Sequence, residues 1–397
     1  MDVVVVGGGF AGLSVASHLC TSSDLEVILF EKGSVGDPSK TSAASFVDAI
    51  TKFKLSDSIE QLYRKYVLRS ESGLYAYFEI DKPVLALIDY KKACEILVDR
   101  AKSRNFELYE KMPVLDFYFK DSNTIEVITP GYTVRTKVLV DATGSSFFCG
   151  KKLGLKLPTF FEHAYGYVLE SDEIKSFDEF CLFGGEHSPG GGWFYPTANG
   201  VAKFGCCVGS HSTNFPEEVL RSNLKYLLET LEPYNHVFKR ARVLRVEKGT
   251  IPLGPVRNLV YKRVMFVGDS AGMATPWAAE GLRPALEAGK LCAEAIIRAF
   301  ENEKDFDSYI KLYQHMWNKL CRKIYLSNMR WSKIKYKLNN EGWDSIVKKY
   351  QRYDTEKVIK RLKTGEGVTK SKLIKIIILT MKLKLDHILK RSIFEEV

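Results

Sequence analysis

The 397-residue sequence lacks the features that mark secreted and membrane-spanning proteins. It enters the apolar run "VVVV" directly after Met1-Asp2, without the basic segment and cleavage site of a signal peptide, so we expect a cytoplasmic protein. No apolar run reaches the roughly 18 residues needed to span a bilayer. The longest one near the end, "IIILTM", is bracketed by Lys375 and Lys382.

Metal-binding and redox-dithiol patterns are also missing. The chain has eight cysteines, but no two of them form a Cys-x-x-Cys pair, and the histidines show no ligand spacing. We therefore expect reduced thiols and no metal site. The sequence is otherwise that of an ordinary globular protein with 45% hydrophobic residues, long enough for two closely joined domains and a tail.

Residues 1–300 have no net positive charge, and the net positive charge of the chain is concentrated after residue 300. Residues 1–300 carry 35 Lys and Arg against 36 Asp and Glu, whereas residues 301–397 carry 23 against 12. The segment "KSKLIKIIILTMKLKLDHILKR" mixes lysines with apolar residues, as basic amphipathic helices do. A solvated helical face and a surface that contacts an anionic membrane both fit this pattern, and no nucleic-acid partner is expected.

The N-terminal stretch "VVVVGGGFAGLSVASHLC" carries the clearest motif. A buried strand leads into a glycine turn with G-x-G-x-x-G spacing at Gly7, Gly9 and Gly12, and a helix follows. Such a turn lets the backbone approach a pyrophosphate, whose charge meets the helix N-terminus. The next strand ends in Glu31, 19 residues after Gly12, where a carboxylate accepts hydrogen bonds from a ribose. The stretch predicts a dinucleotide-binding unit.

Two later motifs specify the dinucleotide. The strand "KVLVDATGSS" ends in Asp141-Ala142-Thr143-Gly144, and "RVMFVGDSAGMATPWAAEG" runs through Gly268-Asp269 into a loop and a helix. Together with the N-terminal motif they resemble the FAD-binding pattern of the flavoprotein superfamily that includes aromatic hydroxylases, geranylgeranyl reductases and tryptophan halogenases. The resemblance implies that Asp269 holds ribityl or ribose hydroxyls. It also implies that the amides of Gly281 and Leu282 lie near the flavin pyrimidine ring, at a positive helix end.

The resemblance also implies an α/β fold. We expect a Rossmann-like FAD-binding domain of the glutathione reductase and aromatic hydroxylase type in residues 1–154 and 245–300. An antiparallel-sheet substrate domain is expected in residues 155–244, and a basic helical region in residues 301–397. The implied FAD-binding residues are Gly7, Gly9, Phe10, Ala11, Gly12, Glu31, Lys32, Lys40, Thr41, Ser42, Ala43, Arg100, Val114, Ala142, Thr143, Gly144, Gly268, Asp269, Pro276, Gly281 and Leu282.

The mid-chain stretch "PGGGWFYPTANGVAKFG" is similar to an aromatic strand of geranylgeranyl reductases, Pro-x-x-Tyr-x-Trp-x-Phe-Pro. The similarity lies at Pro189, Trp193, Tyr195 and Pro196, while Gly191 stands where the first tyrosine would be. Trp193 and Tyr195 alternate onto one face of a strand. We predict that Trp193, Tyr195 and Pro196 line a substrate cavity, the alternative being an aromatic pair that fills the core between sheet and flavin.

Two departures from the family pattern concern the flavin. Geranylgeranyl reductases usually place a Cys-Gly-Glu-Gly stretch against it, whereas this chain has "GDPSKTSAASFVDAI", which puts residues 40–43 there without a cysteine or an acid. No catalytic proton donor is therefore predicted. The arginine that faces the FAD phosphates in the family is replaced by Tyr90 or Lys91, with Arg100 as a substitute further along the helix.

The resemblance favours an FAD-dependent reductase of isoprenoid carbon–carbon double bonds, in geranylgeranyl chains of archaeal-type lipids or in a prenyl diphosphate. A monooxygenase that hydroxylates an apolar or aromatic substrate uses the same fold, and a prenyl-binding escort protein is a third alternative. Only one dinucleotide fingerprint is present, so electrons must come from NAD(P)H that docks transiently, from a ferredoxin or from a reductase. A lipid substrate is compatible with contact between the basic C-terminal region and a membrane surface, the alternative being a solvated helical face.

Overall fold

A parallel sheet occupies one end of the computed structural model, which describes residues 1–102, 105–256 and 258–364. Its order is β18-β19-β12-β1-β2-β8, and only the β18–β19 pair is antiparallel. The strands of its centre are short and fully buried, because apolar valines and leucines point to both faces. The strands are β18 (Val260–Tyr261), β19 (Val264–Phe266), β12 (Val138–Asp141), β1 (Val3–Val6), β2 (Val27–Phe30) and β8 (Phe106–Tyr109).

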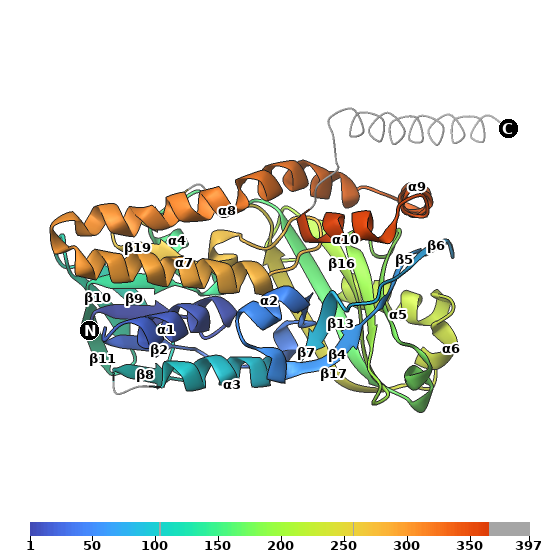
Figure 1. Ribbon diagram of the computed structural model, residues 1–397, viewed down its shortest axis with the longest axis horizontal. Coiled ribbons are helices and arrows are strands. Elements are labelled where there is room, and N and C mark those ends of the chain that lie inside the picture. The colour runs from blue at the N-terminus through green and yellow to red at the C-terminus, as the bar shows by residue number, and fades with distance from the viewer. Residues whose placement is uncertain (103–104, 257, 365–397) are drawn as a thin grey trace.

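Four helices lie side by side along this sheet in the order α3, α1, α7 and α8 (Figure 1). Close approach of α1 to α7 depends on Gly289, where a Cβ would lie 2.5 Å from the Cβ of Ser14. Ser14 also donates a hydrogen bond to the Leu286 carbonyl across the two helices, at 2.8 Å. The helices are α3 (Tyr90–Ala101), α1 (Phe10–Ser22), α7 (Leu282–Glu301) and α8 (Phe306–Lys335).

A seven-stranded sheet forms the other end of the molecule, in the order β17-β13-β16-β15-β14-β5-β6 (Figure 1). Its neighbours pair antiparallel, except for the parallel pair β14–β5. The strands are β17 (Arg242–Pro252), β13 (Phe161–Glu170), β16 (Val201–Ser210), β15 (Gly191–Pro196), β14 (Glu179–Gly184), β5 (Lys65–Ser70) and β6 (Tyr75–Glu79).

The two faces of this sheet are covered differently. One face packs on apolar side chains of α5 (Glu217–Thr230) and α6 (Asn235–Phe238). The opposite face packs on a small sheet of order β3-β7-β4 and on two C-terminal helices. These covering elements are β3 (Ala44–Phe46), β7 (Leu85–Ile88), β4 (Ile59–Tyr63), α9 (Asn340–Tyr350) and α10 (Thr355–Thr364).

The remaining elements connect these layers. A third small sheet, of order β11-β10-β9, lies at the edge of the parallel-sheet end. Its strands are β11 (Tyr132–Thr136), β10 (Ile125–Thr129) and β9 (Asp116–Phe119), and the short helices are α2 (Val47–Lys52), α4 (Phe148–Lys152), η1 (Pro38–Lys40), η2 (Ser56–Ser58), η3 (Gly144–Ser146), η4 (Asp172–Ser176), η5 (Gly268–Ala271) and η6 (Glu303–Asp305).

The predicted α/β architecture with a parallel sheet is confirmed. The domain boundaries remain a prediction. That prediction assigns residues 65–79 and 245–252 to the FAD-binding part, whereas the structure places β5, β6 and most of β17 from these segments in the seven-stranded sheet. Nothing in the sequence near β5 indicates its partner, because β5 pairs with β14, which lies more than 100 residues later in the chain.

Helices make up the last described part of the chain, as expected for the region that begins at residue 301. Within the portion that the structure describes, no helix combines the length and apolar character needed to cross a membrane. The basic amphipathic stretch predicted at residues 370–391 lies outside the described residues.

Candidate functional site

The G-x-G-x-x-G turn joins β1 to α1 at the carboxyl edge of the parallel sheet. Gly7 adopts a φ of +110°, and a Cβ there would overlap the carbonyl of Ala142. A Cβ on Gly12 would overlap the carbonyl of Gly7. By contrast, a Cβ on Gly9 would meet only the Tyr90 hydroxyl, at 3.8 Å, so Gly9 borders open space beside the turn. This glycine cradle fits the pyrophosphate of a dinucleotide.

Glu31 is held at the end of β2 by backbone amides. Its Oε2 accepts a hydrogen bond from the Gly8 amide, and its Oε1 accepts one from Gly33, each at 2.7 Å. Tyr90 lies over the same turn, with its ring centroid 4.9 Å from that of Phe10. Burial raises the pKa of Tyr90, and the carboxylates of Glu31 and Asp269 add to the effect. The phenol therefore stays neutral beside the two acids.

Asp141 ties the second and third motifs together. Its buried carboxylate accepts hydrogen bonds from the amides of Thr143 (2.9 Å) and Cys149 (2.8 Å). Its carbonyl accepts one from the Ser270 hydroxyl (2.6 Å) and one from the Val267 amide (3.0 Å). Burial raises the pKa of Asp141. Because both loops converge on one residue, the stretches 141–144 and 267–270 form a single edge of the site.

Asp269 follows β19 and points toward the start of α7. Gly268 adopts a φ of +67°, and a Cβ there would lie 2.7 Å from that of Ala11 in the glycine turn. A Cβ on Gly281, the residue before α7, would lie 3.7 Å from the Asp269 carboxylate. Burial raises the pKa of Asp269 to about 6. The Glu280 carboxylate accepts a hydrogen bond from the Arg283 amide in the first turn of α7, at 2.8 Å, so an acidic side chain already occupies part of this helix N-terminus.

The loop of residues 40–43 reaches the seven-stranded sheet. The Lys40 carbonyl lies 3.5 Å from the position of a Cβ on Gly249 in β17, while the Lys40 side chain is exposed and pairs with Asp37 at 3.5 Å. Ala43 is buried and adopts a φ of +53°, and its amide is bonded to the Thr41 hydroxyl at 3.0 Å. These residues therefore lie between the two large sheets.

Arg100 is engaged away from the glycine turn. Its guanidinium donates to the carbonyl of Phe53 at 2.6 Å and to that of Lys54. These bonds hold the end of α2 against α3. The geometry therefore does not support Arg100 as the counterpart of the family's phosphate-facing arginine, and that role stays a prediction. Lys32 is exposed, Val114 is half-buried and Pro276 is buried in the loop before α7.

Trp193 and Tyr195 share one face of β15, as their alternation predicts. Their ring centroids lie 6.5 Å apart, and Tyr195 stacks on Phe180 of β14 at 4.2 Å. Glycines opposite Trp193 leave room for the indole, because a Cβ on Gly205 or Gly166 would collide with it. The indole Nε1 is buried and has no hydrogen-bond partner. All three predicted wall residues, Trp193, Tyr195 and Pro196, are buried. Trp193 and Tyr195 pack among apolar side chains, which fits a substrate wall and a filled core alike, so the wall stays a prediction.

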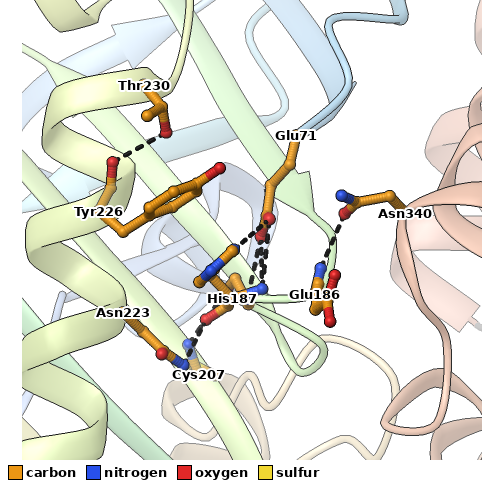
Figure 2. Close-up of polar contacts among 9 residues, drawn as sticks. Glu71, Glu186, His187, Cys207, Asn223, Tyr226, Thr230 and Asn340 are labelled. Carbon is orange, nitrogen blue, oxygen red and sulfur yellow. Dashed lines mark hydrogen bonds and ion pairs between the residues drawn. The ribbon is translucent and has the colours of Figure 1, made fainter.

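The loop between β14 and β15 leads into the aromatic strand β15, and residues of three other elements contact this loop (Figure 2). Glu71, in the turn after β5, accepts hydrogen bonds from the amides of His187 (3.0 Å) and Ser188 (2.9 Å) and lies 3.0 Å from the His187 ring nitrogen. The His187 ring stacks on Tyr226 of α5 at 3.8 Å. Asn340 at the start of α9 accepts from the Glu186 amide at 2.9 Å.

One group of polar residues in contact with each other was not predicted from the sequence. Glu162 of β13 is buried, and its carboxylate lies 3.5 Å from the ammonium of Lys335, the last residue of α8. Tyr336 donates a hydrogen bond to the same carboxylate. Lys335 donates to the Trp277 carbonyl in the loop before α7, at 2.8 Å. No sequence signal reveals these contacts, because 173 residues separate Glu162 from Lys335.

The glycine cradle, the buried acid after β19 and the helix start next to that acid describe a flavoprotein of the FAD-dependent oxidoreductase class. Residues 2–72 match the family described as FAD dependent oxidoreductase. The chain is 24% identical over 384 residues to the digeranylgeranylglycerophospholipid reductase of Methanocaldococcus jannaschii, covering 91% of this chain and 95% of the relative.

Solved structures share the fold. A geranylgeranyl bacteriochlorophyll reductase-like protein from Thermoplasma acidophilum superposes with a TM-score of 0.79 at 18% identity, covering 95% of each chain. The p-nitrophenol 4-monooxygenase of Pseudomonas putida superposes with a TM-score of 0.68 at 20% identity, covering 93% of this chain and 98% of the monooxygenase.

These matches confirm the resemblance to geranylgeranyl reductases, the FAD cofactor and the enzyme class predicted from the motifs. The chain is thus an FAD-dependent oxidoreductase. The individual site residues and the membrane contact stay predictions.

Proposed function

We propose that this protein uses FAD to reduce carbon–carbon double bonds in the isoprenoid chains of a lipid. The observation that carries the proposal is the combination of one dinucleotide cradle with an apolar, aromatic sheet face on the same molecule. The relative in Methanocaldococcus jannaschii is named as a reductase of digeranylgeranylglycerophospholipids, and it matches over nearly its whole length. This match supports the geranylgeranyl lipid as the substrate class.

The cradle residues would hold FAD with its pyrophosphate at the start of α1. Gly7 and Gly12 permit the backbone approach, and Glu31 would face the adenosine ribose. Asp269 would accept hydrogen bonds from ribityl or ribose hydroxyls, which would replace the water that burial removes from its carboxylate. When bound and reduced by an external donor, the flavin would supply a hydride to one carbon of the double bond, and a proton would complete the saturation at the other.

The start of α7 would lie at the flavin pyrimidine ring. The amides of Gly281 and Leu282 lie at the helix N-terminus, where the helix dipole favours negative charge and the Glu280 carboxylate accepts from the next amide, that of Arg283. Negative charge builds up in a flavin when it is reduced, so the helix end would favour the reduced state.

The face of β15 and its neighbours would receive the isoprenoid chain. Trp193, Tyr195 and Phe180 offer flat apolar surfaces, which suit a hydrocarbon without hydrogen-bonding groups. Because β17 runs to Pro252 in the seven-stranded sheet, we propose the substrate domain around residues 155–252, joined by β5 and β6, and the FAD-binding domain in the remainder of residues 1–154 together with residues 253–300. An external donor such as NAD(P)H, a ferredoxin or a reductase would supply electrons.

The lipid substrate would bring the protein to a membrane surface. The excess of lysine and arginine after residue 300 supports an attraction to anionic head groups. Binding to vesicles of anionic lipid that weakens on deletion of residues 365–397 is the expected result, and unchanged binding would contradict this part of the proposal.

Anaerobic turnover tests the function directly. Purified protein reduced with dithionite is incubated with a digeranylgeranyl phospholipid, and the product is analysed by mass spectrometry. We expect the mass of two hydrogens to be added for each double bond. An unchanged lipid, together with insertion of oxygen under air into an apolar or aromatic substrate, would establish a monooxygenase instead. Bound prenyl lipid without turnover in either experiment would indicate an escort protein.

A further inference from the structure

Three distant parts of the chain meet at the ammonium of Lys335. It donates to the Trp277 carbonyl (2.8 Å) in the loop that leads into α7, and it lies 3.5 Å from the Glu162 carboxylate of the seven-stranded sheet. The ammonium also stands 4.7 Å from the ring centroid of Tyr336. A single side chain therefore links the C-terminal helices, the substrate-side sheet and the loop next to the proposed flavin position.

The ion pair of Lys335 and Glu162 is buried, and its burial bears on whether it serves stability or another role. The side chains of Lys335 and Glu162 are each 4% exposed. Removing two charges from water is unfavourable, and apolar side chains of similar size often stabilise a fold as well or better. A buried ion pair is thus a poor means of stabilising the sheet alone. Its bond to a backbone carbonyl of the cofactor loop suggests a role in placing that loop.

The backbone is shaped to admit the residues that carry the pair. Tyr336, which follows Lys335, inserts its ring beside two glycines, where a Cβ on Gly190 or Gly209 would lie 2.7 Å or 2.5 Å from the ring. The Tyr336 hydroxyl donates to the Glu162 carboxylate, and burial together with that carboxylate raises the pKa of Tyr336. The phenol thus remains a donor and fixes the carboxylate that faces Lys335.

We propose that Lys335 is a positioning residue, which sets the loop of residues 272–281 for FAD through the Trp277 carbonyl and is itself held in place by Glu162 and Tyr336. The proposal rests on the proposed assignment of this loop to FAD. Pro276 and Gly281, the predicted flavin contacts, flank Trp277 in the same loop. Through Lys335, the C-terminal helices complete the cofactor site.

Four variants separate positioning from simple packing. The Lys335→Met variant removes the donor to Trp277 but leaves the Glu162 carboxylate buried without its ion-pair partner. The double variant K335M/E162Q removes both charges, so its melting temperature should return toward that of the wild type. Lys335→Arg keeps a charged donor, and Lys337→Met makes the same lysine-to-methionine change at an exposed site two residues away.

The readout is the Kd for FAD, measured by quenching of flavin fluorescence on each variant after removal of its own flavin. We expect K335M/E162Q to bind FAD at least about tenfold more weakly, which corresponds to about 1.4 kcal/mol. The Lys335→Arg and Lys337→Met variants should bind FAD nearly as the wild type does. A double variant that is folded and binds FAD with the wild-type Kd would overturn the proposal.

The lipid assay separates this outcome from that of the proposed function. The proposal concerns the cofactor loop, so weakened FAD binding supports it whether or not the protein reduces geranylgeranyl lipids. Conversely, lipid reduction by a K335M/E162Q variant with an unchanged Kd for FAD would leave the function intact and refute the positioning role.

Discussion

Replacing Asp269 with asparagine should remove a pH-dependent loss of stability from the protein freed of FAD. Burial raises the pKa of this carboxyl from 3.8 to about 6 in the folded protein. The folded state therefore binds the proton more tightly than the unfolded state. Because one pKa unit corresponds to about 1.4 kcal/mol, the carboxylate costs the folded protein at most about 3 kcal/mol.

The sign of the effect follows from the proton binding. Below about pH 4 the group is protonated in both states, and the wild type and the D269N variant should differ little in their free energy of unfolding. Between about pH 4 and pH 6 the unfolded state ionises first, so the wild type loses stability relative to the variant. Above about pH 6 the gap should stay constant, with the variant more stable by up to about 3 kcal/mol.

Urea denaturation of both FAD-free proteins at a series of pH values measures this gap. The same variant should bind FAD more weakly, because an asparagine amide provides one acceptor where the carboxylate provides two. The Asp269 carboxylate would thus lower the stability of the FAD-free wild type while strengthening FAD binding. Parallel stability curves from pH 4 to pH 7.5 would refute the reasoning, because they would show that the carboxylate is not desolvated in the folded state.

Three further substitutions test other parts of the site. Gly12→Ala should abolish flavin binding, because its Cβ would overlap the Gly7 carbonyl; the visible absorbance of the purified protein reports this loss. Trp193→Phe should destabilise the protein by about 2 kcal/mol through the cavity left over the glycines of β13 and β16 and should raise KM for the lipid more than it changes kcat. Glu71→Gln should cost about 2 kcal/mol by weakening the buried bonds to the His187 loop, as measured by urea unfolding.

Each of these three substitutions has a control variant that makes a similar change elsewhere in the protein. Gly33→Ala places a Cβ at an ordinary 3.4 Å contact, so it should keep its flavin. Trp343→Phe removes another buried indole with an unpartnered Nε1, outside the face of β15, and should change stability but not KM. Glu186→Gln makes the carboxylate-to-amide change on the exposed side of the same loop and should change little. Equal effects in a variant and its control would contradict the corresponding prediction.

Local motifs explain why the cofactor half was predictable. The turn at Gly7 and Gly12 and the acid at Asp269 each follow a strand directly, so sequence neighbours become spatial neighbours there. The alternation of Trp193 and Tyr195 likewise fixes their common face, since side chains alternate along a strand. These features depend on spacing within a few residues.

Non-local contacts explain what was missed. Strand β5 reads as part of the N-terminal half, yet it pairs in parallel with β14. Lys335 appears in the sequence as one lysine of a basic helix, and only the fold shows that its ammonium is buried against Glu162. Neither the pairing partner of a strand nor the burial of a charge is encoded by local periodicity.

The interleaved order of the strands has a consequence for synthesis on the ribosome. The parallel sheet needs β19, which ends at Phe266, and the seven-stranded sheet needs β17, which ends at Pro252, alongside β5 from the first fifth of the chain. A nascent chain of 250 residues therefore completes neither sheet and leaves apolar strands without all their partners. This connectivity therefore prevents an N-terminal domain from being completed early in synthesis, and most of the chain must be made before either sheet has all its strands.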